Sequence, residues 1–447
     1  MNLRGTRVAV LGAGVSGRAA ALLAAGRGAE VVVADAGPGE RLADAAAELR
    51  SRGLRVLLGE EALRPDARMD LAVLSPGIPR DSALAGSWMA SSRELLGEIE
   101  FAWRLWEGPV VAITGTNGKT TCTGLTARLL QGGGIACEPA GNYGKPFSQI
   151  VLEGSRHRAA VLELSSFQLE TVSSFHPGIS VWLNFAPDHM DRYASVADYR
   201  GAKQRIFLNQ DERDHAVINS LEFPECPLRS ETITFSAYGE ADFSLAGDGD
   251  GILFRGATVA ALSETCLLGR HNAENLMAAL AVGWIHGLTF DGMRQSAGEF
   301  AAPAHRCELV GRLGGAIYVN DSKSTNAHAL QSSLRAQSAP VVLIVGGKDK
   351  GLDYAPLLEL LREKVRKVIA IGENRRQWSR LCDGRVACEE TGSVEGAVGL
   401  AQAAARSGDV VLFSPGTSSF DMFRDFEQRG EVFRAAVEQR MHQTHVR

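Results

Sequence analysis

The sequence has no long apolar run, and this absence limits where the protein can act. No stretch approaches the roughly 18 consecutive apolar residues that a membrane-spanning helix needs. The N-terminus also lacks the basic, apolar and small-residue regions of an export signal. We therefore expect a cytoplasmic protein with no membrane partner.

Basic runs and paired cysteines are missing as well. The net charge is −5 and no Lys/Arg-rich segment offsets it, which argues against a nucleic-acid partner. The seven cysteines form no C-x-x-C pair, so zinc-ligand spacing is absent. An odd, scattered set of cysteines is typical of reduced thiols in a cytoplasm.

Apolar β-branched runs alternate with helical patterns along almost the whole chain. This alternation predicts an α/β protein, and 447 residues suggest about three domains. We expect a Rossmann-like domain over 1–97, a central P-loop domain with a mostly parallel sheet over 98–302, and a C-terminal Rossmann-like α/β domain over 303–447. Two local expectations are a helix over 92–108 and a small antiparallel part that begins with "ETITFS" (231–236).

The first glycine-rich loop lies in "VAVLGAGVSGRAA", where Gly12, Gly14 and Gly17 follow an apolar run. Asp35 ends the next apolar run, eighteen residues after Gly17. Taken alone, this pattern is the dinucleotide fingerprint and predicts an NAD-dependent dehydrogenase.

A second phosphate loop follows in "PVVAITGTNGKTT". A buried strand, a glycine-bounded turn and a helix start would present backbone N–H groups to phosphate oxygens. Lys119 would add a positive charge, and the Thr120 hydroxyl lies where Mg²⁺ is bound in P-loops. The match is imperfect because Ile113 stands at the first glycine position. The predicted ATP contacts of this loop are Gly115, Thr116, Asn117, Gly118, Lys119, Thr120 and Thr121.

Further polar residues follow predicted strands or lie on helices of the same region. Glu163 ends a buried strand beside the P-loop strand, which suits either a magnesium ligand or a helix-capping acid. Asp188, His189 and Asp191 follow another strand and read equally well as ligands or as a loop salt-bridge set. Lys203 lies on a helical pattern, and considered alone it is an ordinary surface lysine.

The ordered set of motifs resembles the ATP-dependent Mur ligase family, and it spans the whole chain. The motifs are "GTNGKTT" (115–121), "GNYGKP" (141–146), "LELSSFQLE" (162–170), "DHMDRY" (188–193), "YRGAKQRIF" (199–207), "GRHNAENLMAAL" (269–280), "AHRCE" (304–308), "NDSKSTN" (320–326), "GGKDKG" (346–351) and "SPGTSSFDMFRDFEQRG" (414–430). The forms "LELSSFQLE" and "FEQRG" are similar to those of the branch that adds D-glutamate. The resemblance implies a bacterial enzyme of peptidoglycan synthesis, an acid–amino-acid ligase that uses ATP, UDP-N-acetylmuramoyl-L-alanine and D-glutamate and acts as a monomer.

The resemblance also implies roles for individual residues. Lys119, Glu163, His189 and Lys203 would be catalytic, with Thr120 and Glu163 at one Mg²⁺ and His189 at a second. Lys203 would be carbamylated and would position that second metal. The residues that would complete the ATP site are Asn272, Asn275, Arg306 and Asp321.

Substrate contacts follow from the same resemblance. The first domain would hold the uridine diphosphate through Gly14, Val15, Ser16, Asp35, Ser75 and Gly77. The remaining substrate contacts would be Asn142, Ser165, His189, Lys323, Thr325, Lys350, Ser419 and Phe426. Ala36 and Gly37 depart from the family, because relatives often carry a hydroxyl and an arginine there. Uridine binding would therefore be weaker or would use other groups, such as Arg18 or Arg80.

Three alternatives stay open from the sequence. A dehydrogenase would use the first loop but would leave the second loop and the later motifs without a role. A sister Mur ligase or a folylpolyglutamate-type ligase would share the P-loop, although the folate enzymes usually lack a separate domain before it. A non-catalytic nucleotide-binding regulator would bind ATP without releasing phosphate.

Overall fold

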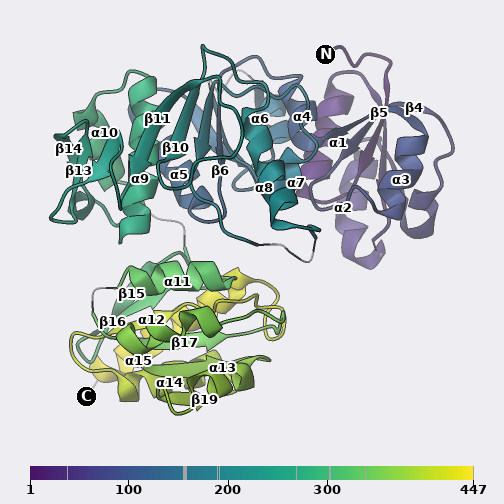
Figure 1. Ribbon diagram of the computed structural model, residues 1–447. Helices are drawn as coiled ribbons and strands as arrows, with labels where there is room; N and C mark the ends of the chain where they lie inside the picture. Colours follow the sequence, from purple (N-terminus) through teal and green to yellow (C-terminus); the bar gives the residue numbers. More distant parts are fainter. Residues whose placement is uncertain are drawn as a thin grey trace. The chain divides into compact units, whose positions relative to one another are not determined.

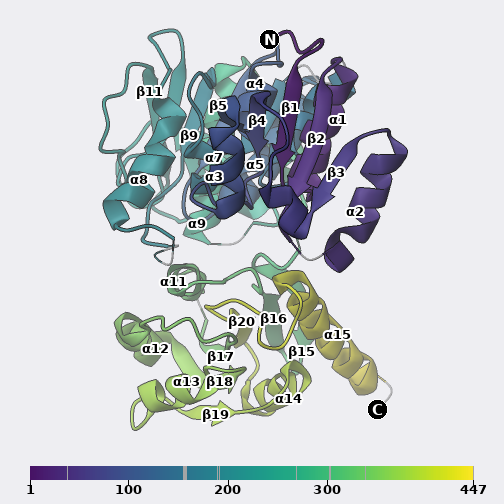
Figure 2. The same cartoon turned by 90° about the vertical axis from the view of Figure 1, so that its right-hand side faces the viewer.

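Three β-sheets flanked by helices make up the chain (Figure 1 and Figure 2). The structure is a computed structural model that describes residues 1–37, 39–154, 159–188, 190, 192–267, 269–301, 304–337 and 339–445. Residues Met1–Thr265 and Glu274–Phe300 form one compact unit, and Cys266–Ala273 and Ala301–Arg447 form a second. The α/β class with three sheets is confirmed, whereas the domain boundaries at 97 and 302 stay predictions.

The first sheet is entirely parallel, in the order β3-β2-β1-β4-β5. Its strands are β1 (Arg7–Leu11), β2 (Glu30–Asp35), β3 (Arg55–Leu58), β4 (Met69–Leu74) and β5 (Ser92–Gly97). The flanking helices are α1 (Val15–Gly26), α2 (Gly39–Ser51) and α3 (Ala83–Ala90). The expected helix over 92–108 is wrong in its first part, because Ser92–Gly97 pairs with β4 and helix α4 (Glu98–Trp103) begins only afterwards.

The central sheet has the order β14-β13-β12-β11-β10-β9-β6-β8-β7. Its strands are β6 (Val110–Thr114), β7 (Cys137–Gly141), β8 (Ala159–Glu163), β9 (Ile179–Trp182), β10 (His215–Asn219), β11 (Glu231–Ser236), β12 (Phe243–Leu245), β13 (Gly251–Phe254) and β14 (Ala257–Ala261). Its helices are α5 (Lys119–Gly132), α6 (Phe147–Glu153), α7 (Ser166–Leu169), α8 (Val196–Gln204), α9 (Arg270–Ile285) and α10 (Phe290–Gly298), with the short 3₁₀ helix η3 (Arg205–Phe207) after α8.

The antiparallel part of this sheet is smaller than expected. Strand β11, the "ETITFS" segment, runs parallel to both β10 and β12. Only the β12–β13 and β13–β14 pairs are antiparallel. The prediction for β11 was therefore wrong, because the Gly- and Asp-rich turn that suggested a hairpin lies after β12 rather than beside β11.

The third sheet has the order β15-β16-β20-β17-β18-β19 and is parallel except for the β15–β16 pair. Its strands are β15 (Glu308–Leu313), β16 (Ala316–Asn320), β17 (Val341–Gly346), β18 (Val365–Ile371), β19 (Cys388–Glu390) and β20 (Val410–Phe413). Its helices are α11 (Ala327–Arg335), α12 (Leu358–Lys364), α13 (Arg375–Cys382), α14 (Val394–Ala404) and α15 (Phe426–His445).

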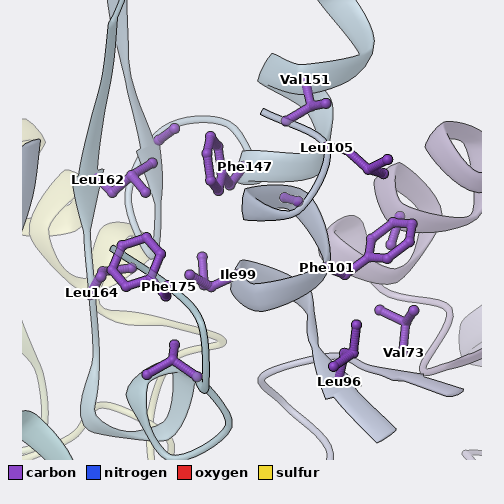
Figure 3. Packing of buried hydrophobic residues seen from close by; sticks show 14 of the residues in the cluster. Val73, Leu96, Ile99, Phe101, Leu105, Phe147, Val151, Leu162, Leu164 and Phe175 are labelled. Carbon is purple, nitrogen blue, oxygen red and sulfur yellow. The ribbon is translucent and has the colours of Figure 1, made fainter. Parts of the chain in front are cut away.

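Helix α4 joins the cores of the first and second sheets. Figure 3 shows Ile99 on the side of Phe175 and Leu164, and Phe101 on the side of Val73. All of these side chains are buried in one continuous cluster. The first two sheets therefore share a hydrophobic core, which agrees with their place in one compact unit. Among the described residues, no helix is both long and apolar enough to cross a membrane.

Candidate active site

The predicted P-loop joins β6, in the middle of the central sheet, to helix α5. Strand β6 lies between β8 and β9, so the residues that follow all three strands gather at one edge of the sheet. Helix α5 begins after Gly118, which has no side chain to cap the helix. The N–H groups of this first turn and the positive end of the helix dipole suit phosphate oxygens.

Asn184, which the sequence analysis did not identify, holds the P-loop in shape. Its side-chain Oδ1 accepts from the Asn117 N–H at 2.9 Å, and its Nδ2 donates to the Asn117 carbonyl at 3.1 Å. The Thr116 N–H also donates to the Asn184 carbonyl at 3.0 Å. The only sequence signal was an asparagine that follows the apolar run of β9.

Glu163 ends β8 and contacts two of the predicted site residues. Thr120 Oγ1 donates to Glu163 Oε2, and Asn142 Nδ2 donates to Glu163 Oε1, both at 2.7 Å. The Glu163 side chain is buried, so this carboxylate is held in place by the two hydrogen bonds. Its contacts favour the ligand interpretation over the helix-capping acid.

Lys119 and Lys203 share one acceptor in the P-loop. Lys119 Nζ donates to the carbonyls of Gly115 and Thr116, both at 2.9 Å. Lys203 Nζ, from α8, donates to the same Gly115 carbonyl at 2.8 Å. The sequence placed these two lysines about eighty residues apart, and the fold brings both amines to one carbonyl oxygen.

The interpretation of Lys203 as a surface lysine is wrong, because its side chain is only 2% exposed. Burial in this position, together with the charge of Lys119, lowers the pKa of the Lys203 amine well below its usual value. Asp188 and Glu163 act in the opposite direction but more weakly. A helical pattern alone could not show which face of α8 is turned inward.

Four further candidate residues of this unit are His189, Asp191, Asn275 and Thr121. His189 and Asp191 lie outside the described residues, so the second predicted metal site is not described. Asn275 lies against the P-loop, because a Cβ built on Gly118 would be 2.4 Å from its Oδ1. Thr121 is buried within the first turn of α5.

The first glycine-rich loop is held by its own residues. A Cβ on Gly17 would lie 1.8 Å from the Gly12 carbonyl oxygen, so α1 crosses directly over the loop and only glycine fits there. Asp35 Oδ2 accepts from the Ala13 N–H and Oδ1 from the Gly37 N–H, each at 2.8 Å. Both Asp35 oxygens therefore fix the loop, and its predicted contact with the uridine stays a prediction.

The rest of this loop leaves room for a ligand. Gly14 and Val15 are exposed, Ser16 is half-buried, and α1 starts after Gly14 without a side-chain cap. Nothing lies within 4 Å of a Cβ built on Gly14. Such an open helix N-terminus suits an anion such as a diphosphate.

A hollow lies between β4 and α7, where the first two sheets meet. Buried Ser75 and exposed Arg80 line it from one side, and Gln168, Glu170 and Arg192 line it from the other. Three nearby candidate residues, Gly77, Ser165 and Arg18, do not line this hollow. Gly77 is exposed, Ser165 caps α7 through hydrogen bonds with Gln168, and Arg18 is paired with Glu48 at 2.6 Å.

In the second unit, Asp321 follows β16 and is fully enclosed by polar partners. Its carboxylate accepts from the Ser414 hydroxyl at 2.9 Å, from the Ser333 hydroxyl, and from the Cys307 N–H at 3.2 Å. Burial raises the pKa of the Asp321 carboxyl, although these hydrogen bonds oppose the shift. The position of Asp321 is therefore fixed within its own domain.

Arg306 lies between two residues with left-handed backbone conformations. The φ angles of His305 and Cys307 are 65° and 47°, which are uncommon for residues with a side chain. His305 is buried, and its Nδ1 lies 3.0 Å from Asn320 Nδ2. Strained conformations of this kind are enriched at functional sites, which is consistent with a specific role for Arg306.

The predicted amino-acid contacts of the third domain lie in its strand-end loops. Lys323 Nζ lies 3.9 Å from the ring centroid of Phe426, the first residue of α15. Thr325 is half-buried just before α11, Ser419 is buried, and Lys350 is exposed in the loop after β17. The structure therefore brings Lys323 and Phe426 into contact.

The sequence analysis also missed Arg429, which is 1% exposed in α15. Its guanidinium donates to the Ser322 hydroxyl at 3.0 Å, to the Ser322 carbonyl at 2.7 Å and to the Thr417 carbonyl at 3.0 Å. Burial lowers its pKa to about 10. Arg429 therefore ties the loop after β16 to the loop after β20.

The oxygen atoms around the P-loop suit Mg²⁺. Thr120 Oγ1 and Glu163 Oε2 lie 2.7 Å apart at the phosphate-binding edge of the sheet, and hydroxyl and carboxylate oxygens are the ligands that Mg²⁺ prefers. These two residues could hold one ion beside bound phosphates. Lys203 as an amine is not a metal ligand of this kind, so its predicted role requires a carboxylate-like modification.

Comparisons with known proteins agree with this arrangement. Residues 113–283 match the Mur ligase middle domain, and residues 305–416 match the Mur ligase glutamate ligase domain. The chain is 39% identical to a protein of Acidobacterium capsulatum named UDP-N-acetylmuramoylalanine--D-glutamate ligase, over 98% of this chain and 97% of that protein. A protein of Aquifex aeolicus with the same name is 38% identical, over 87% and 94% of the two chains.

Solved structures of related enzymes share the fold. The crystal structure of the UDP-N-acetylmuramate-alanine ligase MurC from Thermotoga maritima has a TM-score of 0.63 at 19% identity, covering 98% of this chain and 100% of that one. MurF ligase from the same organism, solved in complex with ADP, has a TM-score of 0.61 at 16% identity, covering 92% and 95% of the chains. The full-length relatives and the two domain matches identify this chain as a member of the Mur ligase family.

Proposed function

We propose that this chain is an ATP-dependent ligase that joins D-glutamate to UDP-N-acetylmuramoyl-L-alanine in peptidoglycan synthesis. One observation carries the proposal from the structure: Lys119, Lys203, Thr120 and Glu163 meet at a P-loop. The names of the full-length relatives supply the substrate pair. A dehydrogenase would leave this cluster without a role.

The reaction must activate a carboxylate toward an amine. The substrate carboxylate attacks the γ-phosphorus of ATP, which forms an acyl phosphate and releases ADP. The neutral amine of D-glutamate then attacks the acyl carbon, and phosphate leaves as the amide bond forms. The task of the protein is to hold these groups in line and to stabilise the charge on the transferred phosphoryl group.

The chain's own residues fit these tasks. The N–H groups at the start of α5 and Lys119 would hold the ATP phosphates, and Asn275 would lie beside them. Thr120 and Glu163 would hold one Mg²⁺, with His189 and carbamylated Lys203 at a second. When bound, Mg²⁺ would spread the negative charge of the γ-phosphoryl group.

Carbamylation of Lys203 requires an uncharged amine, because the nitrogen lone pair attacks carbon dioxide and a proton leaves. The lowered pKa of the buried Lys203 amine supports this step, since it increases the neutral fraction near neutral pH. The product carries a negative charge and two oxygen atoms. It would turn a residue that repels Lys119 into one that attracts cations.

The other two domains would hold the remaining substrates. The open N-terminus of α1 would take the diphosphate of the nucleotide sugar, with Ser75 and Gly77 contacting the same nucleotide. In the third domain, Lys323, Thr325, Lys350, Ser419 and Phe426 would surround D-glutamate, whose two carboxylates suit the lysines and hydroxyls. Arg306 and Asp321 would complete the ATP site, and we place the reaction in the bacterial cytoplasm with the enzyme as a monomer.

One assay tests the proposal. Release of ADP and phosphate is measured with ATP and UDP-N-acetylmuramoyl-L-alanine, while D-glutamate, L-glutamate, L-lysine and diaminopimelate are offered in turn. We expect turnover with D-glutamate alone. Turnover with another amino acid would assign the chain to a sister ligase, and absence of phosphate release with all four would favour a nucleotide-binding regulator.

A variant tests the role of Lys203 in the same assay. Lys203→Ala should lose activity, and added formate or acetate should restore part of it, because a small carboxylate can take the place of the carbamate. The control is Lys367→Ala, which changes a partly exposed lysine of β18 that forms an ion pair with Glu389. Wild-type speed of Lys203→Ala without added acid would contradict the carbamate role.

A further inference from the structure

A second cavity of about 320 Å³ lies against helix α8 and the η3 turn. Its lining residues on this element are Gly201, Gln204, Arg205, Phe207 and Leu208. Positions 201, 204, 205 and 208 share one helical face, because residues three, four and seven apart lie above one another. Ala202, Lys203 and Ile206 are buried on another face, so the cavity uses a different side of α8 from the P-loop.

The opposite wall of the cavity comes from the segment between β10 and β11. Cys226, Pro227 and Arg229 line it, and the ion pair between Arg200 and Glu225 at 2.6 Å ties this segment to α8. The pair also neutralises the nearest carboxylate of the segment. The wall therefore presents apolar surface and the positive charge of Arg229.

Most of the cavity surface is apolar. Phe207 is almost fully buried at its base, whereas Leu208 is 50% exposed and covers one side. Burial raises the pKa of the Cys226 thiol, so this group stays neutral and acts as a small apolar surface. A ligand with an apolar body of modest size fits such walls, since small-molecule sites begin at roughly 300 Å³.

The charged side chains at the cavity are two arginines, Arg205 and Arg229. Arg229 is exposed, and it forms no ion pair with a carboxylate within the described part of the chain. By contrast, the Arg205 guanidinium already donates to the Leu169 carbonyl at 3.0 Å and to the Val172 carbonyl.

We propose that this cavity binds a small amphipathic carboxylate. Its apolar body lies against Phe207, Leu208 and Pro227, and its carboxylate accepts hydrogen bonds from the Arg229 guanidinium. An anion supplies a negative charge to pair with Arg229. A cation is disfavoured beside Arg229, and a purely apolar ligand would make no use of this charge.

The site is distinct from the machinery proposed for the ligase reaction, because it uses another face of the helix that carries Lys203. Its occupant would press on α8 from the side of Gly201 and Gln204. Binding at this position is therefore measurable whether or not the chain has the proposed activity.

The test uses 4-phenylbutyrate as the probe and the full-length protein. Its dissociation constant is measured from the NMR signals of the probe during titration. We expect saturable binding, about tenfold weaker in Arg229→Ala because a charge-assisted hydrogen bond is lost. Leu208→Asp, a change at a half-exposed position, should weaken binding by a similar factor through repulsion and loss of apolar surface.

Two controls complete the design. Arg213→Ala removes an arginine that is 85% exposed and paired with Asp211, and it should leave the dissociation constant unchanged. The uncharged analogue 4-phenylbutyramide should bind wild type more weakly than the acid does. Equal affinity of wild type and Arg229→Ala for the acid, or no saturable binding by wild type, would overturn the proposal.

Discussion

Replacement of Lys203 by methionine should stabilise the protein at neutral pH. The Nζ atoms of Lys119 and Lys203 donate to the same Gly115 oxygen at 2.9 and 2.8 Å, so they lie at most 5.7 Å apart, the sum of the two bond lengths. If both amines were charged, they would repel by about 3 kcal/mol at an effective dielectric constant of about 20. The folded protein either bears this repulsion or gives up the Lys203 proton, and each alternative lowers its stability below pH 10.5. Methionine has a similar length, removes this cost, and leaves the Gly115 carbonyl bonded to Lys119.

We expect Lys203→Met to raise the free energy of unfolding by about 1–3 kcal/mol in carbon-dioxide-free buffer near neutral pH. The gain should shrink as the pH rises. The pKa of Lys203 in the folded protein is lowered from its ordinary value of 10.5. At pH values between these two pKa values, the unfolded wild type therefore binds more protons than the folded wild type. Wild-type stability therefore increases with pH in this window by up to about 1.4 kcal/mol per unit relative to the variant, and the increase ends above it.

Urea unfolding of both proteins at several pH values between about 7 and 9 measures this difference. Lys145→Met is the control: the ion pairs of Lys145 raise its pKa, so the difference between this variant and wild type should stay constant over the range. Added carbon dioxide should stabilise wild type and leave Lys203→Met unchanged. A difference between wild type and Lys203→Met that does not vary with pH would refute the assignment of a buried, largely neutral amine.

Three further substitutions have expected outcomes. Lys119→Ala should abolish phosphate release while the far-ultraviolet circular dichroism stays that of the folded protein; near-normal turnover would contradict the P-loop assignment. Gly141→Ala should be less stable to urea than Gly134→Ala by about 1–3 kcal/mol. Both positions have positive φ, but only at Gly141 would a Cβ lie 2.4 Å from a backbone oxygen, that of Glu163. Equal stabilities of the two variants would show that the backbone relaxes freely. Arg429→Met should lower the unfolding free energy of the third domain by at least about 2 kcal/mol, because two carbonyls and a hydroxyl lose a buried charged donor; an unchanged thermal transition would contradict this role.

Local motifs predicted the parts of the site that depend on contiguous residues. The P-loop and its strand were found because strand, turn and helix start follow one another within a few residues. Glu163 was singled out because it ends a buried strand of the same α/β unit, and parallel strands bring their carboxyl ends to one edge. The α/β class could be predicted for the same reason.

Features that depend on tertiary contact could not be predicted from the residues alone. Strand β5 contains Glu and Leu, which also suit helices, and only its pairing with β4 decides between the two. Strand β19 has three residues at a sheet edge and carries no periodic signal. The burial of Lys203 depends on which face of α8 is turned toward the P-loop. Asn184 and Arg429 act through partners that are distant in sequence.

The hydrogen bonds of Arg429 have a consequence for synthesis of the chain on the ribosome. Strand β16 pairs with β20, about ninety residues later, and the loop after β16 is also bonded to Arg429 of the last helix. The third domain thus cannot complete its framework until Arg429 has been translated. The phosphate-binding loop of the preceding unit draws its contacts from residues before 301 and can form earlier. A ribosome that stops before residue 429 would thus release a chain whose first unit is complete and whose third domain lacks the hydrogen bonds of Arg429.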